Sequence, residues 1–331
     1  MSLLIDGALR DDWLESERKG GEFVRRDSQF RHWVTADGSA GPSGEGGFKA
    51  EPGRYHLYIS HACPWAHRTL IFRKLKGLEE MISLSVVHPD MGDEGWKFAS
   101  ASGEPFEGTS DDTVNGFDYL YQAYTLAQTD YTGIVTVPVL WDKQRQTIVN
   151  NESAEIIRIF NSAFDGCGAS GPDYYPEALR EDIDSINAFV YDNINNGVYR
   201  TGFAASQAAY ERAFRRLFDA LDALEQRLAG QRYLVGAQIT EADWRLFTTL
   251  VRFDAVYVGH FKCNLRRIAD YPNLSGYLRE LYQLPGIAEM INFIHIKRHY
   301  YYSHTSINPT RIIPLGPKLA LHAPHQRQHL K

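Results

Sequence analysis

Hydrophobic residues in the first half of the chain gather in short runs, separated by segments with helical spacing and by turns. The elements that this pattern predicts, in chain order, are a strand in "RYHLYIS" (54–60), a helix from Pro64 to Lys76, a strand in "MISLSVV" (81–87), a helix from Gly116 to Leu126, strands in "VPVLWD" (137–142) and "QTIVN" (146–150), and a helix from Ser153 to Phe160. The order β-α-β-α-β-β-α predicts a small mixed sheet covered by helices.

The period of the pattern becomes helical from about Tyr174 onward. One apolar stripe consists of Leu179, Ile183, Ile186, Val190 and Ile194. A longer helical run spans Ala208 to Leu228. The segment "ITEADWRLFTTLVRF" opens with Thr240 and has Asp243 three positions later, which predicts a capping box at the start of another helix. The second half is therefore expected to be all helical.

These patterns divide the chain into an N-terminal extension, an α/β domain, an all-helical domain and a C-terminal tail. The expected boundaries are 1–54, 55–165, 174–302 and 303–331. The extension ends in the glycine-rich "GSAGPSGEGGFKAEPG", which lacks the Gly-Lys-Ser/Thr of a phosphate loop and is expected to wrap irregularly on the body. A long polar insert, residues 88–112, follows the second strand of the α/β domain, and inserts of this length tend to be functional or mobile.

The composition narrows the classes of function. The 331 residues are 44% hydrophobic and 23% charged with a net charge of −6, which gives no reason to expect nucleic acid or an anionic membrane as a partner. No apolar run is long enough for a membrane span, and the first residues do not resemble a secretory signal. The three cysteines are few and widely spaced, which argues against a disulfide framework and for a reducing, cytoplasmic location.

The most informative residue for the chemistry is Cys63 in "YISHACPWAHRTL", at the junction between a predicted strand and a predicted helix. Pro64 suits the first helical position, so Cys63 is expected at the mouth of the helix, where unpaired N–H groups favour an anion. A helix N-terminus lowers the pKa of a thiol below its usual value of about 8.5. The sequence therefore predicts a reactive thiolate.

Other interpretations of Cys63 compete with this one. An inert, packed thiol fits poorly with a Cys-Pro pair at the junction of a strand and a helix. A metal site could use His61, Cys63 and His67, but the sequence offers no fourth ligand nearby. A dithiol switch is excluded locally because Ala66 stands where the second cysteine would be. A lone thiolate can still attack a sulfur electrophile and be released by an external thiol, and glutathione is the thiol that the cytosol supplies.

Further segments suit a glutathione site. A cis Val137–Pro138 bond in "VTVPV" would leave the Val137 backbone free to pair with an extended peptide, with an ordinary turn proline as the alternative. Glu152 and Ser153 open the next helix. Helix mouths bind carboxylates, and Glu152 could take the ammonium of a γ-glutamyl group. Simple helix capping is the alternative role of this pair, and both roles could hold together.

The order of these motifs, followed by an all-helical domain, resembles the cytosolic glutathione transferase fold, which joins an α/β thioredoxin-like N-terminal domain to an all-α C-terminal domain. Among its classes, "HACPWAHRTLIFRKLKGLE", "TVPVLWDK", "NESAEIIRIFN", "NNGVYRTGFA" and "SINPTRIIPLGP" are similar to segments of the glutathionyl-hydroquinone reductases, the Xi class. The resemblance runs from about Ile5 to Pro317. "CPWAHR" alone also suits omega-class relatives, whereas "NNGVY" together with "INPTRIIPLGP" is much more specific.

The resemblance implies a role for each matching residue. It implies a nucleophile at Cys63, a cover over bound glutathione at Trp96, a backbone partner at Val137, a γ-glutamyl site at Glu152 and Ser153, a proton donor at Tyr199, and a hydroquinone pocket lined by Tyr257 and Tyr300. Without the resemblance each tyrosine would be assigned to core or surface, and the consecutive Tyr300, Tyr301 and Tyr302 cannot all face one pocket. Ile134 stands where the family usually has an arginine, which predicts weaker glutathione binding or a substitute cation.

The implied reaction removes glutathione from glutathionyl-hydroquinones through a mixed disulfide on Cys63, which free glutathione then releases as oxidised glutathione. Glutathione is a co-substrate, and no metal or other bound cofactor is implied. The family is dimeric, which implies a homodimer. An omega-like thioltransferase or dehydroascorbate reductase using the same cysteine is one alternative. A non-enzymatic scaffold that binds ligands or proteins is the other.

Overall fold

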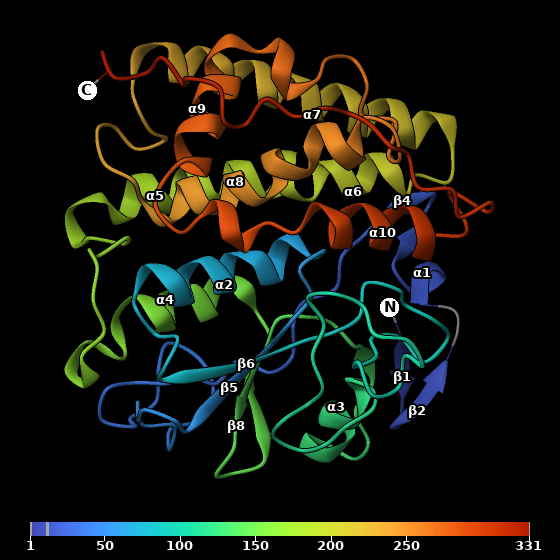
Figure 1. The fold of residues 1–331 in the computed structure, drawn as a ribbon, viewed down its shortest axis with the longest axis vertical. Coiled ribbons are helices and arrows are strands. Elements are labelled where there is room, and N and C mark those ends of the chain that lie inside the picture. Colours follow the sequence, from blue (N-terminus) through green and yellow to red (C-terminus); the bar gives the residue numbers. More distant parts are fainter. Residues whose placement is uncertain (1, 11–12, 331) are drawn as a thin grey trace. The chain divides into compact units, whose positions relative to one another are not determined.

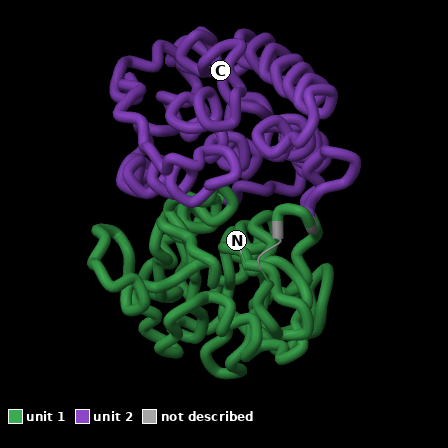
Figure 2. The backbone as a smooth tube through the Cα atoms, turned by 90° about the vertical axis from the view of Figure 1, so that its right-hand side faces the viewer, with its two compact units in different colours: residues 1–16, 26–172 green, residues 17–25, 173–331 purple. Residues whose placement is uncertain are grey.

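The computed structural model describes residues 2–10 and 13–330. The backbone divides into two compact units, the first of residues 1–16 and 26–172 and the second of residues 17–25 and 173–331 (Figure 2). Residues 1, 11 and 12 of the expected N-terminal extension and residue 331 of the expected tail lie outside the described residues. Residues 17–25, which the sequence pattern groups with the extension, belong to the second unit.

The first unit is the α/β structure that the order of elements predicts. Its elements are β1 (Leu3–Ile5), β2 (Ala8–Arg10), α1 (Trp13–Ser16), β5 (Tyr55–Ile59), α2 (Pro64–Leu75), β6 (Ile82–Val86), α3 (Tyr121–Ala127), β7 (Gly133–Ile134), β8 (Val139–Asp142), β9 (Thr147–Asn150), α4 (Ser153–Ser162) and the 3₁₀ turn η1 (Asp165–Cys167). Among the described residues, the main sheet has the order β6-β5-β8-β9, with β5 and β6 parallel and the other neighbours antiparallel. This thioredoxin-like arrangement confirms the expected fold class of the first unit.

Strand β5 is a fully buried inner strand of the main sheet. All of its residues are buried, which is expected of a strand that has neighbours on both edges and side chains packed on both faces. Helices α2 and α4 pack against each other beside the sheet (Figure 1), and α3 packs against β9. Helix α2 ends just before Gly77, whose φ of +61° is the left-handed conformation that glycine adopts readily.

Helix α3 begins later than the sequence pattern predicts. The expected start was Gly116, but the helix spans Tyr121–Ala127. The preceding loop is held in another conformation by Asp112, whose carboxylate accepts hydrogen bonds from the backbone N–H groups of Val114 at 3.0 Å and Asn115 at 3.3 Å. Aspartate competes with helical hydrogen bonding in this way, so the local side chain overrides the apolar spacing.

Part of the expected N-terminal extension is built into the first unit. Strand β1 pairs with β7, in a register that sets Leu3 opposite Ile134. Further along, the His32 backbone N–H donates to the Val149 carbonyl at 2.9 Å, at the free edge of β9. Covering an edge strand removes a site for unwanted pairing between chains. These contacts also place residues 28–33 beside the start of α4.

The second unit is helical apart from one short hairpin, as far as its described residues extend. Its elements are β3 (Arg18–Lys19), β4 (Glu22–Phe23), η2 (Glu177–Leu179), α5 (Arg180–Val190), η3 (Tyr191–Asn195), α6 (Gly197–Gly202), α7 (Gln207–Gly230), α8 (Glu241–Arg252), η4 (Phe253–Tyr257), η5 (Ile268–Asp270), α9 (Pro272–Tyr282), η6 (Ala288–Met290) and α10 (Phe293–Ser303). The expected capping box at Thr240 and Asp243 is present at the start of α8. Within the described ranges, none of the helices has the length and apolar character needed to span a bilayer.

The helical pattern is interrupted by π-helical turns at η3 and η4. Of the predicted stripe, Ile183, Ile186, Val190 and Ile194 are buried as expected, whereas Leu179 is half-buried. The backbone widens after Val190. The η3 turn is held by Asn195, whose side-chain amide donates to the Thr249 hydroxyl at 2.8 Å and to the Arg245 carbonyl at 3.1 Å. Such turns are often found at functional sites. The η3 turn lies shortly before Tyr199, and the η4 turn contains Tyr257.

Candidate active site

Cys63 lies at the position that the Cys-Pro pair predicts. It is the residue before α2, with extended backbone angles (φ −77°, ψ 122°), and Pro64 occupies the first helical position. The Cys63 carbonyl accepts the first hydrogen bond of the helix from the His67 N–H at 3.0 Å. Cys63 is half-buried and is not part of a disulfide. Its Sγ donates to the Val137 carbonyl at 3.5 Å, and the Val137–Pro138 bond is cis, as expected.

A buried tyrosine braces the backbone on which Val137 lies. The Tyr124 hydroxyl donates to the Thr136 carbonyl at 2.9 Å and accepts from the Thr136 N–H at 3.2 Å. The side-chain amide of Asn151 also donates to this hydroxyl at 3.2 Å. Burial raises the pKa of Tyr124 above its ordinary value, so the group remains a neutral phenol that can both donate and accept. The residue before Val137 is therefore held on both of its peptide groups.

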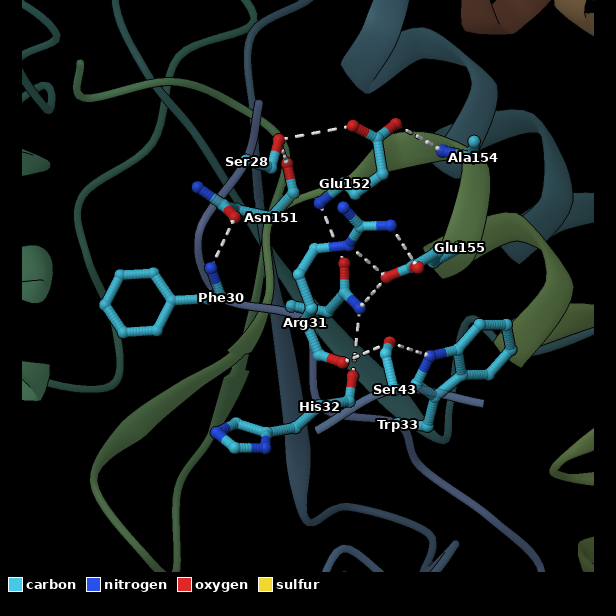
Figure 3. Close-up of polar contacts among 11 residues, drawn as sticks. Ser28, Phe30, Arg31, His32, Trp33, Ser43, Asn151, Glu152, Ala154 and Glu155 are labelled. Atoms are coloured by element: carbon cyan, nitrogen blue, oxygen red, sulfur yellow. Dashed lines mark hydrogen bonds and ion pairs between the residues drawn. The ribbon is translucent and has the colours of Figure 1, made fainter. Parts of the chain in front are cut away.

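Glu152 caps helix α4, and residues of the N-terminal segment surround it (Figure 3). One carboxylate oxygen accepts from the Ala154 N–H at 3.0 Å, and the other accepts from the Ser28 hydroxyl at 3.2 Å. Ser28 also lies 3.2 Å from the Asn151 carbonyl. One helical turn further on, Glu155 forms an ion pair with Arg31. The sequence-based alternative of helix capping is thus a real role of Glu152, and Ser28 fixes the rest of its carboxylate.

Ser153 lies next to a buried cation. Its hydroxyl accepts a hydrogen bond of 3.4 Å from the guanidinium of Arg68, a residue that is 2% exposed. The same guanidinium lies over the ring of Trp65, 4.6 Å from the ring centroid. Because Arg68 lies in the second turn of α2 and its guanidinium reaches Ser153, a positive charge lies beside the start of α4.

Trp96 comes from the polar insert and is only 3% exposed. Backbone hydrogen bonds hold the insert at Trp96 and at the next residue: the Trp96 carbonyl accepts from the Leu120 N–H at 2.9 Å, and the Lys97 carbonyl accepts from the His88 N–H at 2.8 Å. The insert is therefore ordered around the indole.

Among residues 2–10 and 13–330, no group of three or more His, Cys, Asp and Glu side chains is arranged to hold a metal ion.

A tyrosine cluster forms the chemical centre of the second unit. The hydroxyls of Tyr199 and Tyr300 lie 2.6 Å apart, and those of Tyr257 and Tyr300 lie 3.2 Å apart. Tyr199 belongs to α6, Tyr257 to η4 and Tyr300 to α10, so three helical segments supply the cluster. Phe203 and Phe261 pack on Tyr199 with ring centroids 6.1 and 5.5 Å away.

The members of the cluster differ in burial. Tyr257 is fully buried and Tyr300 is 2% exposed, whereas Tyr199 is 9% exposed. Desolvation raises the pKa values of Tyr257 and Tyr300 well above the ordinary value, and the nearby Arg252 offsets only part of this effect. These two tyrosines therefore stay protonated and act as neutral hydrogen-bond partners of Tyr199.

The comparisons with known proteins cover nearly the whole chain. Sequence models of the glutathione S-transferase N-terminal and C-terminal domains match residues 62–163 and 207–280. The glutathionyl-hydroquinone reductase YqjG of Escherichia coli is 58% identical over 99% of this chain and 98% of its own, and PcpF of Sphingobium chlorophenolicum is 58% identical over 96% of each. The glutathione-bound structure of YqjG covers 98% of both chains with a TM-score of 0.90 at 56% identity. The glutathione S-transferase Xi of Phanerochaete chrysosporium has a TM-score of 0.84 at 53% identity, covering 89% of this chain and 97% of its own.

The chain belongs to the Xi class of the glutathione transferase family. The expected fold and family are thereby confirmed. The predicted site residues of this Xi-class chain fall into two sets. The first unit carries Cys63, Trp96, Val137, Glu152 and Ser153, and the second carries Tyr199, Tyr257 and Tyr300. Cys63 contacts Val137, and the tyrosines contact one another. Tyr301 and Tyr302 are more exposed than Tyr300, in line with the argument that consecutive residues cannot share one pocket.

Sequence reasoning missed several polar residues of this Xi-class site. Arg68 is part of the quoted "CPWAHR", but the sequence does not indicate that its side chain is buried. A buried and an exposed arginine cannot be told apart from one sequence. Ser28 lies in the irregular extension, where no periodicity points to a partner. Ile134, at the place where an arginine was expected, is 8% exposed and sits opposite Leu3 in a strand pair.

Proposed function

We propose that this chain is a glutathionyl-hydroquinone reductase, which removes glutathione from glutathionyl-hydroquinones and releases hydroquinone and oxidised glutathione. The observation that carries the proposal is a cysteine thiol that is in no disulfide, instead of a serine or tyrosine hydroxyl, at the N-terminus of α2 and against Val137. A hydroxyl there would hold glutathione thiolate for conjugation. A thiol forms a disulfide with glutathione instead. YqjG and PcpF, both 58% identical to this chain, are named glutathionyl-hydroquinone reductases.

In the first half-reaction, the Cys63 thiolate attacks the sulfur of the glutathionyl-hydroquinone. A bond forms between the two sulfurs, and the bond between sulfur and the ring carbon breaks. The electron pair of the broken bond remains on the ring carbon, which takes the proton of the Tyr199 hydroxyl. The products are the hydroquinone and a Cys63–glutathione mixed disulfide. Two-step covalent catalysis of this kind gives ping-pong kinetics.

In the second half-reaction, the thiolate of a free glutathione attacks the glutathione sulfur of the mixed disulfide. Oxidised glutathione leaves, and Cys63 returns as a thiolate. The proton from the glutathione thiol restores the Tyr199 phenol. Over the full cycle one glutathionyl-hydroquinone and one glutathione become one hydroquinone and one oxidised glutathione, so the reducing equivalents come from glutathione.

The glutathione molecule is held by the first unit in this proposal. Its backbone pairs with Val137, its γ-glutamyl carboxylate takes the mouth of α4 at Ser153, and its ammonium pairs with Glu152. The buried Arg68 beside Ser153 supplies the positive charge that is absent at Ile134. Trp96 covers the bound peptide. Helix N-termini and arginine side chains both stabilise carboxylates.

Ser28 tests whether Glu152 takes part in glutathione binding. Ser28→Ala removes a hydrogen bond of 3.2 Å to the Glu152 carboxylate. We expect the Kd for glutathione to rise about fivefold, because a lost hydrogen bond of this kind costs roughly 1 kcal/mol. Calorimetric titration of glutathione into both proteins measures the change.

A matched control for this variant is Ser43→Ala in the same N-terminal segment. The Ser43 hydroxyl bonds to the Arg31 carbonyl and to the Trp33 indole, and Figure 3 shows it apart from Glu152. Its Kd for glutathione should stay within about twofold of the wild-type value. Equal Kd values for Ser28→Ala and the wild type would contradict the role given to Glu152.

The activity is tested with glutathionyl-menadiol and free glutathione. The proposed function requires equal amounts of menadiol and oxidised glutathione, with initial rates that follow a ping-pong law. Reduction of dehydroascorbate or a small disulfide without turnover of the hydroquinone adduct would replace the proposal with an omega-like reductase. Absence of every one of these activities would leave a binding scaffold.

A homodimer in the cytoplasm completes the proposal. Cys63, Cys167 and Cys263 form no disulfide, which suits a reducing compartment, and the family resemblance supports the dimer. Light scattering of the purified protein should give twice the mass of one chain. A mass of 37.6 kDa, that of the single chain, would remove the dimer from the proposal.

A further inference from the structure

The hairpin of residues 17–25 is firmly held in the second unit, although it comes from the N-terminal part of the chain. Phe23 is 2% exposed and packs on Phe203 with ring centroids 5.4 Å apart. The Gly21 carbonyl accepts from the Ala205 N–H at 2.9 Å. At the surface, Glu22 forms an ion pair of 2.6 Å with Arg212 on α7. The hairpin is therefore an integral part of the helical unit.

Arg25 follows this hairpin and lies over the ring of Tyr199. The central carbon of its guanidinium is 5.0 Å from the centroid of the Tyr199 ring and 5.4 Å from that of Phe23. Its Nε donates to the side-chain carbonyl of Asn196 at 3.0 Å. Asn196 is 3% exposed and comes three residues before Tyr199 in "NNGVY". Arg25 therefore contacts both the Tyr199 ring and Asn196, which belongs to the same "NNGVY" motif as Tyr199.

Within the described residues, charged or titratable groups lie near Tyr199 on three elements. Arg25 comes from the segment after β4, Tyr257 from η4 and Tyr300 from α10. Arg252 acts electrostatically on Tyr257 and Tyr300, and the His304 ring lies 5.3 Å from that of Tyr300. His304 is buried, which lowers its pKa well below the ordinary value and keeps it neutral. Tyr257 and Tyr300 stay neutral as well. Of these neighbours, Arg25 is the permanent cation that lies on the ring of Tyr199.

We propose that Arg25 is a positioning residue for the reaction: it holds the Tyr199 ring in place and stabilises the phenolate that forms when Tyr199 gives up its proton. This inference rests on the proposed function, in which Tyr199 protonates the departing ring carbon. A cation over an aromatic ring is attracted to the π-face, and the attraction grows when the ring gains negative charge. The Tyr300 hydroxyl, 2.6 Å away, donates a hydrogen bond to the same phenolate.

The consequence for the chemistry is a stronger acid at Tyr199. In the first half-reaction the O–H bond of Tyr199 breaks and a C–H bond forms on the ring carbon. A group that favours the phenolate lowers the pKa of Tyr199 and speeds this transfer. Removing the cation raises that pKa, so the proton transfer becomes slower at every pH below it.

Arg25→Met removes the charge and keeps a side chain of similar length, whereas Arg25→Lys keeps the charge. We expect kcat for the hydroquinone adduct to fall about tenfold in Arg25→Met and less than about threefold in Arg25→Lys, from the usual strength of a partly desolvated cation–π pair. The KM for glutathione should change little, because Arg25 belongs to the second unit. Arg180→Met is the matched control, because Arg180 lies over the half-buried Tyr175 at 5.2 Å and should leave kcat unchanged.

A double-mutant cycle separates this role from a purely structural one. In the Tyr199→Phe background there is no hydroxyl proton to give, so Arg25→Met should cause no further loss of kcat. An equal loss in both backgrounds would overturn the inference, even if Arg25→Met lowers the melting temperature. If Arg25→Met fails to fold, the cycle is run with Arg25→Gln, which loses the charge but retains a side chain able to reach Asn196.

A direct titration makes the outcome independent of turnover. Tyrosine labelled with ¹³C at the carbon that bears the hydroxyl is followed by NMR against pH, and the Tyr199 signal is assigned by its absence in Tyr199→Phe. The inference requires the pKa of Tyr199 to be higher in Arg25→Met than in the wild type, by about one unit. An unchanged pKa overturns it whatever the activity. If the wild type lacks the proposed activity while this pKa still moves, the proposed function fails and the Arg25–Tyr199 coupling stands.

Discussion

Replacing Cys63 with serine is expected to lower the turnover of glutathionyl-menadiol at least about a thousandfold, as losses of a catalytic nucleophile commonly do. The serine hydroxyl can occupy the same place before α2 and reach the Val137 carbonyl. It cannot form a disulfide with glutathione, however, and it is scarcely ionised near neutral pH. Both half-reactions pass through the cysteine sulfur, so no other step can compensate for the change.

Mass spectrometry of the intact protein checks this result directly. With one equivalent of glutathionyl-menadiol and no free glutathione, the wild type should gain the mass of one glutathione, and Cys63→Ser should gain nothing. Cys167→Ser and Cys263→Ser are the controls, and both should form the adduct. The thiol of Cys263 is fully buried, which raises its pKa far above the ordinary value and makes it inert. An adduct on Cys63→Ser, or its continued turnover, would overturn the mechanism.

The largest effect on stability is expected from Asp243→Ala at the start of α8. The buried Asp243 carboxylate accepts hydrogen bonds from the backbone N–H groups of Thr240 at 2.8 Å and Leu234 at 2.9 Å, and from the Tyr277 hydroxyl at 2.8 Å. Alanine leaves these buried donors without their acceptor. We expect the free energy of unfolding to fall by roughly 3–5 kcal/mol, because each unsatisfied buried group costs about 1–3 kcal/mol.

Urea unfolding followed by circular dichroism measures the loss in Asp243→Ala. Asp219→Ala is a suitable control, because Asp219 is an exposed aspartate within α7. Its free energy of unfolding should stay within about 0.5 kcal/mol of the wild-type value. If the two variants were equally stable, the capping box would not hold α8 in place as described, and the packing of α8 would have to form without it.

Much of the fold could be predicted because its local signals agree with one another. The strand-to-helix junction at Cys63 follows from Pro64, and the start of α8 follows from the spacing of Thr240 and Asp243. The apolar stripe of α5 is buried as its period predicts. In each case the signal lies within a few residues of the element it sets, so one sequence is enough to read it.

The features that escaped prediction depend on partners far away in the chain or on rare backbone geometry. Ser28 meets Glu152 across 124 positions, and Arg25 meets Asn196 across 171. No spacing rule links such pairs. The π-helical turn before α6 shifts the register by one residue, which the 3.6-residue period cannot represent. The start of α3 was misjudged because the Asp112 carboxylate, and not the apolar spacing, shapes the loop before it.

The origin of the hairpin has a consequence for the order in which a new chain can assemble. Residues 17–25 leave the ribosome early, but the α6 and α7 residues that hold them are made about 170–190 positions later. At ordinary synthesis rates the hairpin waits roughly ten seconds or more for its binding site. Tyr300 arrives later still, on α10. Ribosome-bound chains therefore carry the Cys63 thiol before the second unit can fold completely. A chain released before α10 is made has the nucleophile but lacks the complete tyrosine cluster.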